Sequence, residues 1–98
     1  MKDLIAHLNK VFESRVRLGI MSVLTVNQTY DFKSLKETLD LTDGNLASHL
    51  KALEKEGMIA VEKQFIDRKP NTSYRATEKG RAAFSEHISA LENLIRDT

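Results

Sequence analysis

The fold is decided by the stretch from Thr42 to Gly57, which reads TDGNLASHLKALEKEG. Leu46, Leu50 and Leu53 recur in it at the spacing of one face of an α-helix. Thr42 is a residue type that caps helix N-termini, and Gly57 is the type most often found just past a helix C-terminus. The stretch therefore predicts an amphipathic helix whose leucine side faces a core.

Another helix is predicted directly before this one. Asp31 can cap a helix in which Phe32, Leu35 and Leu39 lie on one side. Only the dipeptide Asp40-Leu41 separates that helix from the cap of the next. Because so short a connection makes two helices cross steeply, the pair is predicted to be a helix-turn-helix.

The side of the second helix that faces away from the leucines is small and polar. Such a face suits the major groove of DNA, where small residues allow close approach, amides and hydroxyls reach base edges, and cations reach phosphates. The alternative is an ordinary solvated face, which many helices present. The candidate DNA-binding residues of this helix are Thr42, Gly44, Asn45, Ser48, His49 and Lys51.

The segment after the helix favours the DNA interpretation. From Ile59 to Ile66 the apolar period changes to two, and Ser73 to Thr77 can return as a second strand around a predicted turn at Asp67 to Thr72. Basic side chains on such a projecting hairpin, or wing, would reach phosphates or the adjacent minor groove, whereas the alternative is a solvated turn rich in charge. The candidate wing residues by charge are Arg68, Lys69 and Arg75.

Both ends of the chain are more apolar than a small core requires. The last helix, capped by Thr77, repeats its apolar residues in heptad fashion, and a short first helix is apolar for its length. We expect the two helices to pack together across a twofold axis; the alternative is that each covers only its own protomer. The predicted dimer residues are Leu4, Ile5, Leu8 and Phe12 in the first helix and Phe84, Ile88, Leu91, Leu94 and Ile95 in the last.

These elements predict a mainly α protein with a small β-hairpin, that is, an α+β winged helix-turn-helix. The expected order is four helices, the hairpin and a last helix, with Ser14 capping the second helix. The 98 residues are expected to form one domain. Its parts are a first dimerisation helix at 1–12, the helix-turn-helix core and wing at 14–77, and a C-terminal dimerisation helix at 78–98.

Composition excludes several function classes. The chain has no cysteine, so disulfides, thiol catalysis and cysteine-based metal sites are absent. Its net charge of +1 means that any basic contact surface must be local. No apolar run approaches the ~20 residues that cross a bilayer, and no signal-peptide pattern is present, so a cytoplasmic protein without a membrane partner is expected.

The histidines favour neither a metal centre nor an enzyme. His7 and His87 lie on the predicted dimer helices without accompanying ligands, so surface or interface imidazoles are preferred over metal sensing. Ser48 stands beside His49, but the sequence offers no third group to complete a nucleophilic triad. We therefore expect no cofactor, no metal and no catalytic residue.

Three segments resemble MarR/ArsR-like winged-helix transcriptional regulators. The last of the three resembles in particular the small stand-alone branch of that group. They are SRVRLGI at 14–20, LTDGNLASHLKALEKEGMI at 41–59 and RKPNTSYRATEKGR at 68–81. The resemblance implies a homodimer on a pseudo-palindromic operator. It also implies a set of groove-facing residues, Gly44, Asn45, Ser48 and His49, and a wing tip formed by Arg68, Lys69 and Thr72.

One residue departs from this pattern. Asp43 places an acid beside the groove. Its charge either interacts favourably with the positive N-terminal end of the helix or selects against some DNA sequences. The main hypothesis is a homodimeric transcriptional regulator, expected to repress by binding double-stranded DNA at a promoter. Its rivals are a winged-helix protein-interaction module that works through the C-terminal helix and an architectural DNA binder of low sequence specificity. The resemblance also implies a small-molecule effector between the terminal helices and the core, although no group of polar residues marks its site.

Overall fold

The computed structural model describes residues 5–96. Two 3₁₀ turns, η1 (Ile5–His7) and η2 (Lys10–Phe12), precede the first α-helix. The order then runs through α1 (Arg15–Val26), β1 (Tyr30–Asp31), α2 (Phe32–Leu39), α3 (Asp43–Lys55), β2 (Ile59–Ile66), β3 (Lys69–Ala76) and α4 (Glu78–Arg96). The predicted winged helix-turn-helix is therefore confirmed.

The predicted helix caps are also confirmed. The side chains of Ser14 and Thr42 accept hydrogen bonds from the backbone nitrogens three residues on, at 3.3 and 3.2 Å. Asp31 accepts from both the backbone nitrogen and the hydroxyl of Ser34, at 3.1 and 2.6 Å. The hydroxyl bond is the main reason why the pKa of Asp31 lies below its ordinary value. Since these caps satisfy donors that a helix leaves unpaired, they determine where α1, α2 and α3 begin.

The core lies where α1, α2 and α3 meet the base of the sheet. Leu46 and Leu53 of α3 are fully buried, and so is Leu35 of α2. The α3 leucines therefore point inward, as their spacing predicts, and leave the polar side of that helix to the solvent. The other buried hydrophobic residues of this core are Phe12, Ile20, Met21, Leu24, Leu50, Met58, Ile59, Tyr74, Ala76 and Phe84.

The sheet has three antiparallel strands in the order β1-β3-β2. Its hairpin is longer than predicted, because β3 begins at Lys69 and the turn is only Asp67 and Arg68. Pro70 is consequently a strand residue, paired with Phe65. A proline is tolerated there because β1 pairs with β3 only at Ser73 and Tyr74, which leaves this end of β3 as an edge.

The described part of the predicted first helix (1–12) is not α-helical. Asn9 explains the break, since its side chain accepts a hydrogen bond from the nitrogen of Val11 (2.9 Å). The backbone nitrogen of Asn9 instead donates to Nδ1 of His87 (3.0 Å). These bonds compete with those of a continuous helix. Leu4, one of the predicted dimer residues, lies outside the described residues.

Two other predicted dimer residues belong to the protomer's own core. Phe12 is 1% exposed and Phe84 is 8% exposed, and their rings meet edge to face with centroids 5.5 Å apart. His87, expected at the surface or an interface, is buried beside them, 5.4 Å from the Phe12 ring. The prediction for these three residues was wrong because α4 uses this side to cover the N-terminal segment.

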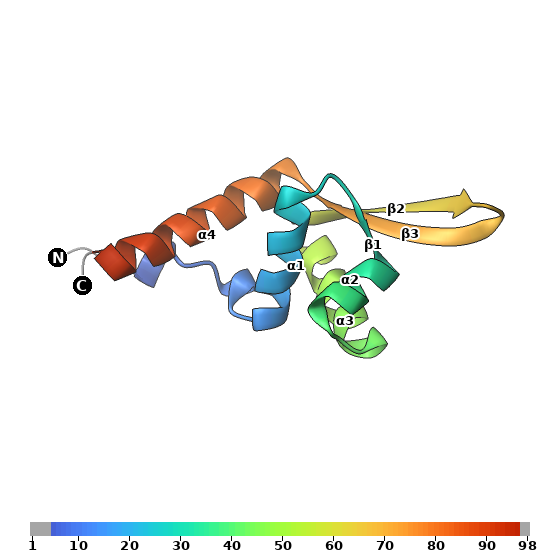
Figure 1. Ribbon diagram of the computed structural model, residues 1–98. Helices are drawn as coiled ribbons and strands as arrows, with labels where there is room; N and C mark the ends of the chain where they lie inside the picture. Colours follow the sequence, from blue (N-terminus) through green and yellow to red (C-terminus); the bar gives the residue numbers. More distant parts are fainter. Residues whose placement is uncertain (1–4, 97–98) are drawn as a thin grey trace.

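The molecule is elongated, with principal extents of 58 × 25 × 21 Å. Figure 1 shows α4 and the β2-β3 hairpin projecting in opposite directions from the bundle of α1, α2 and α3. Gly80 sits where α4 leaves the sheet, and a Cβ there would overlap the backbone carbonyl of Met58. Arg81 ties α4 to the end of α1 by donating to the carbonyl oxygen of Thr25 at 2.9 Å. The wing and the long helix are thus both anchored to one core.

Candidate nucleic-acid interface

The outward side of α3 is small, polar and exposed. Gly44, Asn45, Ser48 and Lys51 are all exposed. A Cβ placed on Gly44 would meet no atom within 4 Å, so packing within the protomer does not require a glycine there. Thr42 has its hydroxyl oxygen engaged as the helix cap. The open face therefore leaves room for a close partner at the N-terminal end of α3.

An ion pair spans the helix-turn-helix beside this face. Nζ of Lys36, on α2, lies 2.8 Å from Oδ1 of Asp43, the first residue of α3. The acid that departs from the family pattern thus has a cation next to it, as well as the positive end of the helix. Both side chains are substantially exposed, so the pair contributes little to stability. Its main effect is on the charge that α3 presents.

His49 differs from the other predicted residues of α3 because it is half-buried and already has a partner. Nε of Arg17, on α1, donates to its Nδ1 at 3.1 Å, and Nη1 of Arg17 donates to the carbonyl oxygen of Val11 at 3.3 Å. Burial and, secondly, the Arg17 charge lower the pKa of His49. With Nδ1 accepting, the neutral ring carries its proton on Nε2, which leaves Nε2–H as its hydrogen-bond donor.

The strand register determines which wing residues share a face. Directly paired residues project to the same side of a sheet, and the side that carries Ile59, Val61 and Tyr74 packs against the helices. Farther out, the same side presents Lys63 paired with Thr72, then Phe65 paired with Pro70. We call this side the helix-side face of the wing.

The opposite face contains Arg75, another predicted contact. Its Nε donates to Oε1 of Glu62 at 3.2 Å across the hairpin, and both side chains are partly exposed. Arg75 is therefore separated from the α3 surface by the thickness of the sheet and carries an acid beside it. The structure brings Thr72 to the side of α3 but not Arg75.

The wing tip carries charge in a strained turn. Asp67 and Arg68 both have left-handed backbone conformations, with φ of 51° and 65°. Two-residue hairpin turns of this kind favour Asn-Gly or Asp-Gly, and a left-handed residue other than glycine costs roughly 1–2 kcal/mol. Within residues 5–96, neither Arg68 nor Lys69 forms an ion pair. Two unpaired cations thus stand at the tip of the wing.

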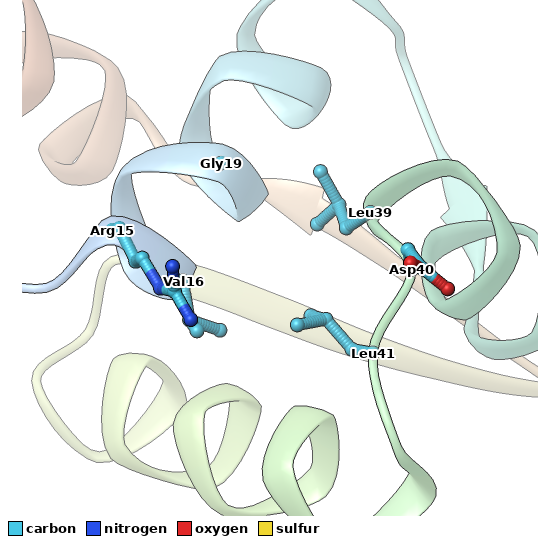
Figure 2. A pocket seen from close by; sticks show the side chains of 6 residues that line it. All are labelled: Arg15, Val16, Gly19, Leu39, Asp40 and Leu41. Carbon is cyan, nitrogen blue, oxygen red and sulfur yellow. The ribbon is translucent and has the colours of Figure 1, made fainter.

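A pocket of about 350 Å³ opens between α1 and the turn that joins α2 to α3. Figure 2 shows Val16, Leu39 and Leu41 as its apolar side chains, with the Arg15 guanidinium on the α1 side and the Asp40 carboxylate on the turn. Another pocket, of about 300 Å³, lies between the end of α1 and α4 and includes Phe84 and Ile88. The second pocket is the one nearer the effector position expected from the sequence.

The exposed side of α4 carries an apolar stripe. Ile88 and Leu91 are each 36% exposed and Ile95 is 78% exposed, at the helical spacing of one face. Ile5, whose segment η1 contacts α4, is 70% exposed. Leu8 and Leu94 are half-buried. Of the predicted dimer residues, these six remain outside the core and form what we call the α4 stripe.

In the described residues, no cluster of three or more His, Asp or Glu side chains could hold a metal ion. Among the same residues, the helices are too short or too polar to span a bilayer.

A family model described as a winged helix DNA-binding domain matches residues 16–95. The chain belongs to this family. It is 40% identical to an uncharacterised protein of Methanocaldococcus jannaschii over 88 residues, which are 90% of this chain and 96% of that protein. A solved transcriptional regulator homologue from Pyrococcus horikoshii is 32% identical, with a TM-score of 0.80 over 94% of this chain and 96% of the other.

More distant solved structures share the fold. One is the transcriptional repressor CouR bound to a 23-mer DNA duplex (21% identity, TM-score 0.78, 97% of this chain and 66% of the other). A second is a MarR-family regulator from Rhodococcus (15% identity, TM-score 0.70, 91% and 65%). The resemblance to winged-helix transcriptional regulators is confirmed by the family model and the Pyrococcus homologue, and the MarR-family structure shares the fold.

Sequence reasoning missed three residues of this surface. Arg17 is 32 positions from His49, and Lys36 meets Asp43 only because the turn folds α2 back on α3. Neither partner pair has a spacing that a sequence pattern could detect. Phe65 could have been found, because strict alternation along β2 places it on the same side as Val61 and yet beyond the reach of the core.

Proposed function

We propose that the protein is a homodimeric transcriptional regulator that binds a pseudo-palindromic DNA operator and represses by occupying it. In this proposal α3 enters the major groove, with Asn45, Ser48 and the Nε2–H of His49 at base edges. The basic residues neutralise phosphates; they are Lys51, Arg68 and Lys69. Gly44 lets the DNA backbone approach α3 closely, and Thr72 contacts DNA from the helix-side face of the wing. Arg75 contributes at most a distant phosphate contact.

One observation carries this proposal: a small, polar and exposed α3 face lies on the same side as a wing whose tip has two unpaired cations. A polar helix face that only contacts solvent would not explain the charged wing, and a charged wing alone could bind any acidic partner. Together they offer a helix suited to a major groove and a charged hairpin suited to phosphates and the neighbouring minor groove. CouR, whose fold is similar, was solved on a DNA duplex, which supports the same docking for this chain.

The homodimer is proposed from the α4 stripe. Ile5, Ile88, Leu91 and Ile95 leave apolar surface in water at the end of the molecule farthest from the wing. Pairing the stripes of two copies about a twofold axis would cover it and present two α3 helices about one DNA turn, ~34 Å, apart.

A small-molecule effector is proposed for the pocket of Figure 2 rather than for a site nearer α4. A ligand there would sit between α1 and the α2–α3 turn, so that its binding changes the angle at which α3 leaves the core. Arg15 and Asp40 offer opposite charges across an apolar floor, which suits a zwitterionic ligand with a hydrophobic body.

The proposed function is tested by selection from a random duplex library, followed by affinity measurements on the enriched duplex. We expect an enriched inverted repeat, and Arg68→Ala should weaken binding to it several-fold. Lys10→Ala is the matched control, because it removes one exposed charge from the N-terminal segment beside α4. Failure to enrich a motif would favour the architectural binder. A wild-type protein that binds no duplex would favour the protein-interaction module, and equal binding by Arg68→Ala and the wild type would remove the wing tip from the proposed contact.

A further inference from the structure

The wing has two large apolar side chains near its tip, although charged residues alone would be enough to contact phosphates. Phe65 is 79% exposed and Ile66 is 51% exposed, at the end of β2 farthest from the core. Exposed to this extent, neither side chain does much to stabilise the protomer. Adjacent exposed apolar residues of this size on a projecting element are typical of a contact surface.

Strand alternation separates the two side chains. Phe65 belongs to the helix-side face, paired with Pro70 and following Lys63. Ile66 projects from the opposite face, paired with Lys69. A partner that contacts α3 and the helix-side face would therefore cover Phe65 and Pro70 and leave Ile66 exposed.

The charge around Phe65 indicates the chemistry of that partner. Lys63, Arg68 and Lys69 lie within four residues of it along the hairpin. The two acids in the same span are Asp67 and Glu62, and Glu62 lies on the opposite face, where it forms an ion pair with Arg75. Arg68 occupies a left-handed position that glycine would adopt without strain, so the turn keeps a cation at its apex against the preference of its backbone. The tip therefore fits a polyanion that also offers apolar surface.

The minor groove of DNA has both properties. Its rims are phosphates, and its walls are the C–H edges of deoxyriboses in a channel about 6 Å wide, into which apolar side chains insert in several architectural proteins. The wing also reaches well beyond the core, on the scale of the separation between grooves. At about 3.3 Å per residue, Phe65 lies ~13 Å beyond Val61, the last residue of its face packed against the core. The neighbouring minor groove lies about half a turn, ~17 Å, from the major groove.

We propose that Phe65, with Pro70 beside it, packs against the deoxyribose walls of the minor groove that flanks the groove occupied by α3. Arg68, at the apex of the turn, and Lys69, whose long side chain starts on the Ile66 face, hold phosphates at the rims. This inference rests on the proposed DNA-binding function and adds to it a non-ionic part of the wing contact. The wing then contributes affinity that added salt does not screen.

The experiment measures the affinity of the full chain for its selected duplex across a salt series. Phe65→Ala should weaken binding roughly ten-fold and leave the slope of log affinity against log salt unchanged. Ile66→Ala is the matched control on the opposite face and should stay within about two-fold of the wild type. Arg68→Ala should instead lower the salt slope by about one. Because Phe65 and Ile66 are exposed, both variants should keep the wild-type melting temperature, which circular dichroism checks.

Hydroxyl-radical cleavage of the bound duplex locates the contact, because the radicals attack deoxyribose from the minor groove. Wild type and Ile66→Ala should protect the sugars that flank the α3 site, and Phe65→Ala should lose that protection at saturating protein. If the wild type binds the duplex and Phe65→Ala keeps the same affinity and the same sugar protection, the inference is overturned and the proposed function stands. A wild-type protein that binds no duplex would overturn both.

Discussion

The Nε atom of Arg17 donates a hydrogen bond to Nδ1 of His49 across 3.1 Å, and thereby joins α1 to the helix that presents the proposed DNA-reading face. The same guanidinium donates to the carbonyl oxygen of Val11, so the N-terminal segment belongs to the same network. A neutral His49 is needed for this arrangement, because a protonated imidazole has no free acceptor. The position of α3 is thus coupled to one titratable ring.

The first prediction concerns pH and stability. Burial and the Arg17 charge hold the pKa of His49 below its ordinary value of 6.5. Protonation therefore favours the unfolded chain, where the ring titrates normally. The contribution of this ring is fully present above pH 6.5 and is lost as the pH falls through the lower folded-state pKa. We expect the melting temperature of wild type to fall more between pH 7 and pH 5 than that of His49→Gln, measured by calorimetry.

Two features make this difference interpretable. Glutamine is neutral throughout that range and its side-chain oxygen can still accept from Arg17. The other acid-sensitive groups are common to both proteins and cancel in the comparison. Parallel curves for the two proteins would show that the Arg17–His49 bond is not linked to protonation.

The second prediction concerns Asp43 and DNA. Replacing it by Asn removes a negative charge from the start of α3 and releases Lys36. Both changes make the proposed interface more positive, so Asp43→Asn should bind non-specific duplex several-fold more tightly and discriminate less among sequences. Glu37→Gln, an exposed change of the same charge on α2, is the control. Competition of a selected duplex against random duplex measures both effects, and unchanged discrimination would contradict a selective role for the acid.

The elements that could be predicted from sequence are those determined by local rules. Periodicity and the capping residues Ser14, Asp31 and Thr42 place α1, α2 and α3 almost to the residue. The hairpin was predicted with too long a turn, because Pro70 and Asn71 read as turn residues although an edge strand accepts them. Local composition does not show that the far end of β3 is paired with β2 alone.

The rest depends on tertiary contacts that pattern analysis cannot detect. Phe12 and Phe84 each fit the apolar pattern of a terminal helix, and that pattern predicted an interface. They are 72 positions apart in the sequence, so only the fold brings their rings together. The bond between Asn9 and His87 likewise replaces an α-helical N-terminus by two short turns. For the same reason residue type alone could suggest the proposed DNA surface, while the bonds of His49 and Asp43 became visible only in the structure.

The third prediction compares two glycines. A methyl group at Gly80 would overlap the backbone carbonyl of Met58, whereas one at Gly44 would meet nothing within 4 Å. Gly80→Ala should therefore destabilise the fold by roughly 3 kcal/mol or more, since backbone cannot move aside cheaply. Gly44→Ala should stabilise it by up to ~1 kcal/mol, because alanine is the better helix former. Urea unfolding monitored by circular dichroism gives both free energies.

The same Gly44→Ala variant also tests the DNA surface. If α3 approaches the groove closely at this position, the added methyl group should weaken duplex binding even though the protein is more stable. Opposite signs for the two effects cannot come from partial unfolding. A variant that is both more stable and equally tight in binding would remove Gly44 from the proposed contact.

The last prediction concerns the α4 stripe and oligomeric state. Leu91→Lys places a charge at the centre of the stripe, where pairing with a second copy would bury it without a partner. We expect this variant to sediment as a monomer and to bind an inverted-repeat operator at least ten-fold more weakly, because one recognition helix is lost from each complex. Asn93→Lys adds the same charge on the far side of the same helix, two residues on, and should remain dimeric. Since Leu91 is only partly covered within the protomer, circular dichroism should show that Leu91→Lys stays folded. A wild-type protein that sediments as a monomer at micromolar concentration, or a dimeric Leu91→Lys, would contradict pairing through this stripe.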